Sequence, residues 1–296
     1  MIMEPESKIQ ALIQLLDDPD RRVYESVSKS IMDFGPDVIP ELEKAWEYAL
    51  NEFQQQRIEN LIQEIQSINF QDSLSIWQKS KHPNLLEGTY LIAKFQYPDL
   101  SFERIEMEIE TISKDVWLEL NENLTALEKT RILNYILFDT YKFSGNYSNF
   151  YAPQNNFLNT VLETRKGNPE SLGIIYSIIG QRLGLPIYGV NLPRNFILAY
   201  VDNPHPPHEK DSNVQDQILF YINPFRKGSV LNRTDIEQFI KSQNLSFRPS
   251  FLQPCSHQDI VERLIHNLIY SYGKSGQVEK VKKYKKLLKL FRSTSP

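Results

Sequence analysis

The residues that most often perform chemistry in proteins are thinly spread along this sequence. Its single cysteine, Cys255, stands two positions before His257, a spacing that does not by itself make a thiol–imidazole pair. His205 and His208 lie in a polar stretch with no acidic or cysteine residue clustered tightly around them. We therefore favour a solvated loop over a metal site at the two histidines, and a plain structural thiol at Cys255.

Common nucleotide and metal motifs are missing. Gly184 and Gly189 have the outer spacing of a phosphate-binding loop, but Val190-Asn191 follow where Lys and Ser or Thr are required. The sequence contains no His-Glu-x-x-His zinc helix and no Cys-x-x-Cys pair. It therefore predicts neither a metal nor a cofactor.

The most informative segment is a predicted helix that starts directly after Gly167. Asn168 is a suitable helix cap, Pro169 is tolerated at the first helical position, and Glu170 complements the positive end of the helix. Ser171 is a candidate nucleophile and Glu170 a candidate carboxylate at the same place. No base is evident near Ser171, so an ordinary first-turn serine is the simpler interpretation.

Other elements follow from the spacing of apolar residues. The predicted helix ends at Gly184 in a left-handed conformation, and strands are expected over 187–190, 196–201 and 218–222. An earlier helix is expected to begin at Thr125, with Glu128 as its capping-box partner. These elements predict a mixed α and β region in the second half of the chain.

The two ends of the chain are helical and oppositely charged. Residues 1–66 show four apolar stripes at helical spacing, broken by Asp-Pro and Gly-Pro, which resembles a HEAT-type repeat. Two further helices joined by a turn at Gly273–Gly276 resemble one tetratricopeptide-type unit. The first segment has a net charge of about −8 and residues 271–296 about +7, for which solvated helix faces are favoured over interaction arms.

Composition sets the broad class. The chain has 296 residues, a net charge of −4, 41% hydrophobic residues and 24% charged residues, which is typical of a soluble globular protein of about two domains. The net charge argues against nucleic-acid binding, and no apolar run reaches the roughly 20 residues of a membrane helix. No signal peptide is evident at the start. We expect a cytoplasmic protein that contacts neither nucleic acid nor membrane.

Five short motifs occur in a fixed order over about 80 residues. Together they resemble the transglutaminase-like core of the bacterial SirB-type family, and the resemblance covers roughly residues 85–250. The motifs are Phe143-Ser144-Gly145-Asn146, Arg165-Lys166-Gly167-Asn168-Pro169-Glu170-Ser171-Leu172, Arg182-Leu183-Gly184-Leu185-Pro186, Gly189-Val190-Asn191-Leu192-Pro193 and Ile222-Asn223-Pro224-Phe225.

The resemblance implies a papain-type arrangement of catalytic groups. In the superfamily a cysteine at a helix N-terminus is activated by a histidine on a neighbouring strand, which an aspartate on the next strand orients. In this sequence the helix start falls on Asn168-Pro169, the histidine position on Asn195 and the acid position on Asn223. All three catalytic groups are therefore absent.

Asparagine cannot serve as a general base near neutral pH, but its amide both donates and accepts hydrogen bonds. A pocket lined by Asn168, Asn195 and Asn223 could recognise a ligand without turning it over. The competing interpretation is that these amides only cap a helix and satisfy backbone groups at strand ends. Both interpretations remain open at the level of sequence.

We therefore expect an α+β, predominantly helical fold. Its parts are HEAT-like helices at 1–70, a papain/transglutaminase-like core with a small antiparallel sheet at 71–255, and a tetratricopeptide-like hairpin at 256–296. The expected function is that of a catalytically inactive module that binds a protein or peptide. The alternatives are a hydrolase or acyl transferase with a displaced site at Glu170, Ser171 or a histidine of 205–208, and a scaffold that binds through its charged ends. The predicted ligand-binding residues are Asn168, Glu170, Ser171, Asn195 and Asn223, beside the degenerate position Pro169.

Overall fold

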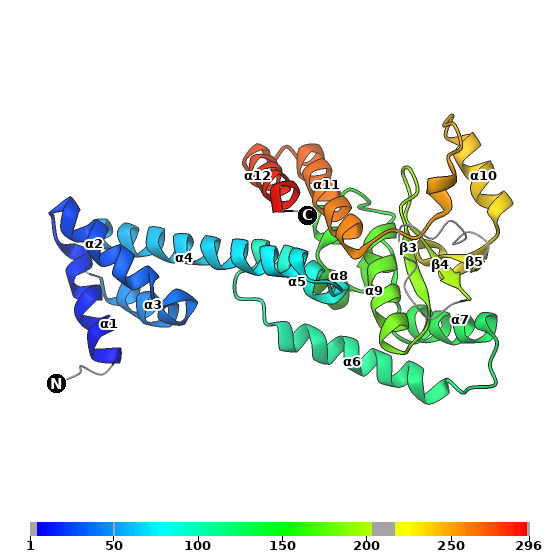
Figure 1. The fold of residues 1–296 in the computed structure, drawn as a ribbon, viewed down its shortest axis with the longest axis horizontal. Helices are drawn as coiled ribbons and strands as arrows, with labels where there is room; N and C mark the ends of the chain where they lie inside the picture. The colour runs from blue at the N-terminus through cyan, green and yellow to red at the C-terminus, as the bar shows by residue number, and fades with distance from the viewer. Residues whose placement is uncertain (1–4, 50, 203–216, 295–296) are drawn as a thin grey trace. The chain divides into compact units, whose positions relative to one another are not determined.

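The computed structural model describes residues 5–49, 51–202 and 217–294 (Figure 1). The chain divides into two units, with the boundary between Ile76 and Trp77. His205 and His208 lie outside the described residues. Each unit is described by itself below.

The first unit is helical because its apolar residues recur at helical spacing. All four predicted stripes lie in helical segments, and their side chains form one core around Leu16, Ile31 and Leu42. Arg57 donates to the carbonyls of Leu16 and Asp18, at 2.9 and 2.7 Å, and so satisfies the end of the first helical segment. The likeness to a HEAT repeat stays a prediction. The helices are α1 (Pro5–Gln14), α2 (Arg21–Met32), α3 (Ile39–Tyr48) and α4 (Glu52–Lys79).

The second unit begins with helices whose ends are set by local signals. The predicted capping box of Thr125 and Glu128 is confirmed. The helix over 233–242 was not predicted, although Asn232 and Asp235 form the same kind of capping box there. The helices are α5 (Leu85–Gln96), α6 (Phe102–Glu119), α7 (Ala126–Asn134), α8 (Leu158–Thr164), α9 (Pro169–Arg182), α10 (Arg233–Ser242), α11 (His257–Lys274) and α12 (Val278–Thr294).

A four-stranded antiparallel sheet stands beside α9. Its strand order is β3-β4-β5-β6, and Leu198 pairs with Ile222 across the central strands. The three predicted strands are confirmed to within one residue at each end, whereas the short edge strand β6 and a small parallel pair, β1 with β2, were not predicted. The strands are β1 (Ser144–Gly145), β2 (Lys166–Gly167), β3 (Ile187–Val190), β4 (Ile197–Val201), β5 (Ile218–Asn223) and β6 (Ser229–Leu231).

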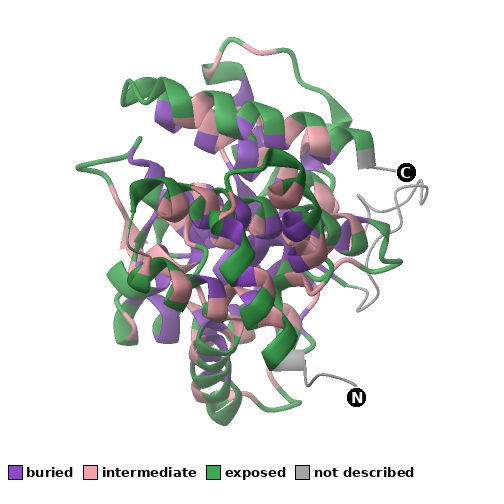
Figure 2. Cartoon of the chain, turned by 90° about the vertical axis from the view of Figure 1, so that its left-hand side faces the viewer, coloured by how far each residue is buried: buried purple, intermediate pink, exposed green. Residues whose placement is uncertain are grey.

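Helices cover both faces of this sheet, so all five residues of β4 are buried. On one face Ile197, Ala199 and Val201 share a core with α10. On the other, α9 is buried from Glu170 through Gly180. Figure 2 colours the chain by burial, with buried residues in purple and exposed residues in green. A Cβ atom at Gly173 would lie 2.6 Å from the ring of Phe196, so the glycine permits close approach of α9 to the sheet.

The last two helices pack against α5 through aromatic side chains. Tyr284 of α12 stacks on Tyr272 of α11 at 5.4 Å and meets Phe95 edge-on at 5.5 Å. Lys283 stands over Phe95, with Nζ 4.2 Å from the ring centre, so part of the positive charge of residues 271–296 has a packing role. The likeness to a tetratricopeptide unit stays a prediction.

The predominantly helical α+β fold class is confirmed by these elements. Within the described ranges, none of the helices combines the length and apolar character that a membrane span requires.

Candidate degenerate active site

The start of α9 is closed by a reciprocal pair of hydrogen bonds. The Ser171 N–H donates to Asn168 Oδ1 at 2.9 Å, and the Asn168 N–H donates to Ser171 Oγ at 3.0 Å. The Asn168 Nδ2 group donates to Asn156 Oδ1 at 2.7 Å, and Pro169 occupies the first helical turn. The predicted cap is confirmed. The polar atoms of both side chains are therefore already engaged within the protein.

Glu170 is a buried carboxylate rather than a solvated one. It is 1% exposed, and Asn267 of α11 donates to its Oε2 atom. Arg263, also on α11, places Nε 3.9 Å from Glu170 Oε1, and neither of these two atoms has a hydrogen-bond partner among the described residues. Burial raises the pKa of Glu170 to about 7, although Arg263 and Asn267 act to lower it.

Arg263 also holds the loop that carries the histidine position. Its guanidinium donates to the carbonyl of Leu192 at 3.0 Å and to that of Asn195 at 2.8 Å. Asn195 stands in the turn before β4, not on the strand where the superfamily pattern places its histidine, because Arg194 takes a left-handed conformation with φ 61°. The Asn195 amide oxygen accepts from the Phe196 N–H at 2.9 Å.

Asn223 is the last residue of β5, and its side-chain Oδ1 atom is buried without a partner among the described residues. The Gly228 N–H donates to the Asn223 carbonyl at 2.9 Å, which closes the following turn. Asn134 fastens this turn to α9, because its amide donates to the Gly228 carbonyl at 2.9 Å and accepts from the Tyr176 hydroxyl at 3.0 Å. The acid position is thus fixed in place but carries no charge.

The elements that follow two of the three positions contact the helix that begins at the third. β4 follows Asn195, the turn Pro224–Arg226 follows Asn223, and both contact α9. No hydrogen bond joins the side chains of Asn168, Asn195 and Asn223 to one another in the described structure. Instead, Arg263 of α11 joins Glu170 to the loop at Asn195, and Asn267 of α11 donates to Glu170. Neither of these α11 residues was predicted from the sequence. Their spacing of four places both on one face of α11, a polar signal within an otherwise apolar stripe.

The remaining candidates form no catalytic pair. The Cys255 thiol donates to the Gly189 carbonyl at 3.2 Å, and burial, followed by the charges of Asp259 and Glu170, raises its pKa. The His257 ring donates from Nδ1 to the Pro83 carbonyl at 2.8 Å, and burial lowers its pKa. In the part of the chain that is described, no three metal-ligating side chains gather.

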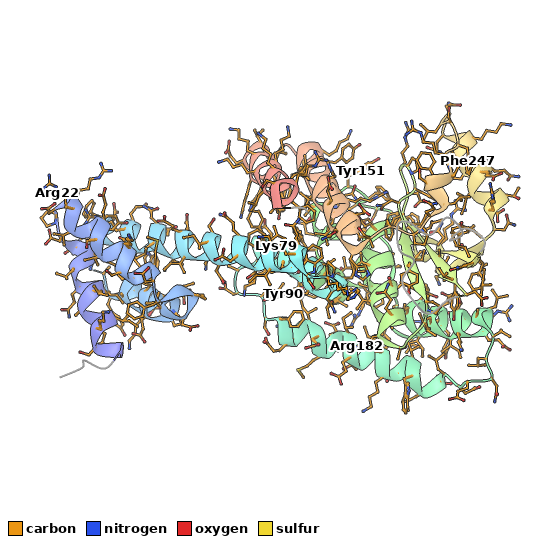
Figure 3. The ribbon with its side chains drawn as sticks, in the orientation of Figure 1. Arg22, Lys79, Tyr90, Tyr151, Arg182 and Phe247 are labelled. Carbon is orange, nitrogen blue, oxygen red and sulfur yellow. The ribbon has the colours of Figure 1, made fainter. Side chains whose placement is uncertain are left out.

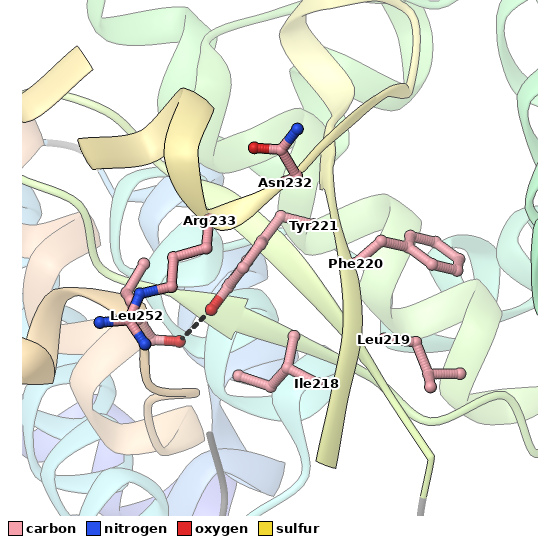
Figure 4. A pocket seen from close by; sticks show the side chains of 7 residues that line it. All are labelled: Ile218, Leu219, Phe220, Tyr221, Asn232, Arg233 and Leu252. Atoms are coloured by element: carbon pink, nitrogen blue, oxygen red, sulfur yellow. Dashed lines mark hydrogen bonds between the residues drawn. The ribbon is translucent and has the colours of Figure 1, made fainter. Parts of the chain in front are cut away.

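A cavity of about 210 Å³ lies on the other face of the sheet, beside α10 (Figure 4). The Tyr221 hydroxyl at its wall donates to the Leu252 carbonyl at 3.0 Å. None of the predicted site residues lines this cavity, so it is not the predicted asparagine pocket. Its lining residues are Ile218, Leu219, Phe220, Tyr221, Asn232, Arg233 and Leu252.

This arrangement can be compared with known families. A profile of the transglutaminase-like superfamily matches residues 103–266, which is more than half of the chain and includes all three degenerate positions. The chain belongs to the transglutaminase-like superfamily. The match includes Arg263 and ends one residue before Asn267, so the α11 contacts lie at the border of the transglutaminase-like core.

Relatives of this transglutaminase-like protein are bacterial and animal. A UPF0162 protein of Xylella fastidiosa is 28% identical over 199 residues, covering 65% of this chain and 66% of its own length. The mouse F-box only protein 21 is 27% identical over 224 residues, covering 68% of this chain but 34% of its own. The match thus spans about two thirds of the bacterial relative and one third of the animal one. No solved structure matches the chain significantly.

Proposed function

We propose that this transglutaminase-like protein is a non-catalytic module that binds a protein or peptide partner beside the start of α9. One observation carries the proposal: each of the three triad positions holds a residue that cannot perform the triad's chemistry. Pro169 and Asn168 replace the nucleophile, Asn195 the base and Asn223 the acid. The elements that would carry the triad are nevertheless all present, and the buried Asn223 Oδ1 has no hydrogen-bond partner among the described residues.

The proposed binding residues are Asn168, Glu170, Ser171, Asn195 and Asn223. Asn195 and Asn223 are the strongest of these, because their amides keep unused donors in the described structure. Asn168 and Ser171 shape the site through their mutual cap, and Glu170 ties it to α11.

The alternative is a hydrolase or acyl transferase that uses a displaced site. The raised pKa of Glu170, about 7, suits a general acid or base. Its burial and its contacts with Arg263 and Asn267 argue against this role, because a substrate cannot approach the carboxylate. Ser171 is similarly occupied, since its hydroxyl also donates to the Asn168 carbonyl at 3.3 Å.

The division of the chain into domains forms part of the same proposal. The core resembles the SirB-type family, and we divide the chain into HEAT-like helices at 1–70, the core at 71–255 and a tetratricopeptide-like tail at 256–296. The flanking helices would each add a further docking surface. A cytoplasmic location is part of this proposal.

A turnover assay tests the non-catalytic part of the proposal. Purified protein should release no amine from casein-derived or amide-linked fluorogenic peptides and incorporate no dansylcadaverine into casein. A Ser171→Ala, Glu170→Gln variant is the matched control. Turnover by the intact chain that disappears in this variant would establish the displaced-site enzyme instead.

A further inference from the structure

A second surface feature lies beside the degenerate site. Five aromatic rings form one connected series, hereafter the aromatic patch. Successive ring centroids are 4.6 Å apart for Tyr147 and Phe225, 5.7 Å for Phe225 and Phe150, 5.1 Å for Phe150 and Tyr151, and 5.6 Å for Tyr151 and Tyr270. Tyr151 is labelled beside α11 in Figure 3. The series joins the loop before α8, the turn after β5 and the α11 helix.

The aromatic patch is exposed rather than part of the core. Tyr147 is 68% exposed, and Tyr151 and Tyr270 are each 51% exposed. The Tyr147 hydroxyl donates to the Phe225 carbonyl at 3.0 Å, whereas the hydroxyls of Tyr151 and Tyr270 have no partner among the residues described. Contiguous exposed rings of this kind are typical of interaction surfaces, where one end of the ring is apolar and the other polar.

The patch adjoins the proposed binding site through three connections. The ring of Phe225 lies so close to Gly145 that a Cβ atom there would stand 2.5 Å away. The Asn146 N–H donates to the Gly167 carbonyl at 2.9 Å, directly before the start of α9. Tyr270 follows Asn267, the partner of Glu170, by one turn of α11. A ligand on the patch would therefore reach the degenerate positions.

Two cationic side chains belong to the surroundings of the patch. Lys274 places Nζ 5.5 Å from the centre of the Tyr270 ring and 6.0 Å from that of Tyr151. Arg226 directly follows Phe225 and is exposed. Neither cation forms an ion pair with an acidic residue that the structure describes, so both are available to an acidic ligand.

We infer that the aromatic patch docks an extended, acidic, proline-containing peptide segment of a partner protein. This inference deepens the proposed function and rests on it. Proline rings pack on aromatic faces, and the preformed polyproline conformation presents carbonyls that free tyrosine hydroxyls bind. Acidic side chains of the segment pair with Lys274 and Arg226. Single-stranded nucleic acid fits less well, because stacking grooves for it are lined by many cations. Among the described residues, we identify Lys274 and Arg226 as the unpaired cations at these five rings.

Fluorescence anisotropy with labelled twelve-residue peptides tests the inference on the full-length protein. A Pro-Pro-Glu repeat should bind, whereas an Ala-Ala-Glu repeat and a Pro-Pro-Lys repeat should bind about tenfold more weakly or not at all. A Tyr151→Ala, Tyr270→Ala variant should lose about tenfold in affinity and Lys274→Glu a comparable amount. The Tyr135→Ala variant, which removes another exposed tyrosine outside the patch, should bind like the intact protein.

Several outcomes would overturn the inference. They are equal binding of the proline-containing and proline-free acidic peptides, no binding of any peptide, and binding that the patch variants leave unchanged. Tighter binding of a twelve-nucleotide oligothymidine that the same variants abolish would assign the patch to nucleic acid. A Tyr151→Phe, Tyr270→Phe variant keeps both rings and is the control for a loss of folding in the alanine variant. Failure here leaves the proposed function testable at Asn195 and Asn223, which none of these variants changes.

Discussion

At the residue scale, the degenerate site replaces reactive groups with hydrogen-bonding ones. Asn168 and Ser171 satisfy each other at the start of α9, so the position that a nucleophile would need is occupied by a cap. The one ionisable group at this start is Glu170, and it is enclosed by α11. Its titration therefore reports on the folded state rather than on a reaction.

Glu170 should make the stability of the protein depend on pH. Its pKa is about 7 in the folded chain against an ordinary value of 4.5, so the folded state binds the proton more tightly than the unfolded state. The stability from this group is complete below pH 4.5 and falls as the pH rises toward 7, by about 3 kcal/mol at most. Urea unfolding across this range should show a steeper decline for the intact protein than for Glu170→Gln. Parallel declines would contradict the raised pKa.

At the element scale, α11 fastens the start of α9 to the loop before β4. Arg263 reaches the carbonyls of Leu192 and Asn195 and faces Glu170, three connections from one side chain. The turn after β5 is fastened separately, through Asn134 and Gly228. A single substitution can therefore remove one of these connections and leave the other in place.

Replacing Arg263 by leucine should destabilise the protein by about 3 kcal/mol, because Glu170 loses its ionic partner inside the protein. Arg263→Lys should recover little, since one ammonium group cannot reproduce the fork that reaches two carbonyls. Hydrogen exchange in a peptide covering 191–197 should accelerate in both variants and not in Arg248→Ala, which removes an exposed arginine. Unchanged exchange in Arg263→Leu would show that α11 does not hold the loop.

The turn after β5 allows a matched pair of glycine substitutions. Gly228 and Gly276 have similar positive φ angles, 70° and 73°. A Cβ atom at Gly228 would lie 1.8 Å from Asn134 Oδ1, whereas a Cβ atom at Gly276 would have no neighbouring atom within 4 Å. Alanine should cost about 1 kcal/mol at Gly276 from backbone strain alone and about 3 kcal/mol at Gly228. Equal losses in urea unfolding would refute the close approach of Asn134.

At the scale of the whole molecule, the chain keeps the frame of the transglutaminase-like superfamily, and we propose that it does so without the superfamily's chemistry. A shared fold positions a site without dictating what the site does, so function must be argued from the residues present. Membership of the transglutaminase-like superfamily covers residues 103–266, and the relatives match this chain over part of their own length. The patch beside the site adds a surface on which a partner can dock.

Local signals in the sequence predicted much of this fold. The caps at Thr125 and Asn168, the left-handed stop at Gly184 and the three strands follow from neighbouring residues alone. The two-residue strands β1 and β2 escaped prediction because they have no periodicity. The contact between Asn267 and Glu170 joins residues 97 positions apart, and no local pattern encodes such a pairing. Only the structure showed that α11 joins the start of α9 to the loop before β4.

The measurement that tests the central claim most directly is quantitative affinity capture from native lysate. The intact protein, an Asn195→Ala, Asn223→Ala variant and an Asn123→Ala control, which removes an exposed amide elsewhere, would be compared by mass spectrometry. We expect a partner that the intact protein and the control retain equally and that the double variant loses. A partner retained equally by all three would contradict binding at the degenerate site and place it on the helical flanks instead.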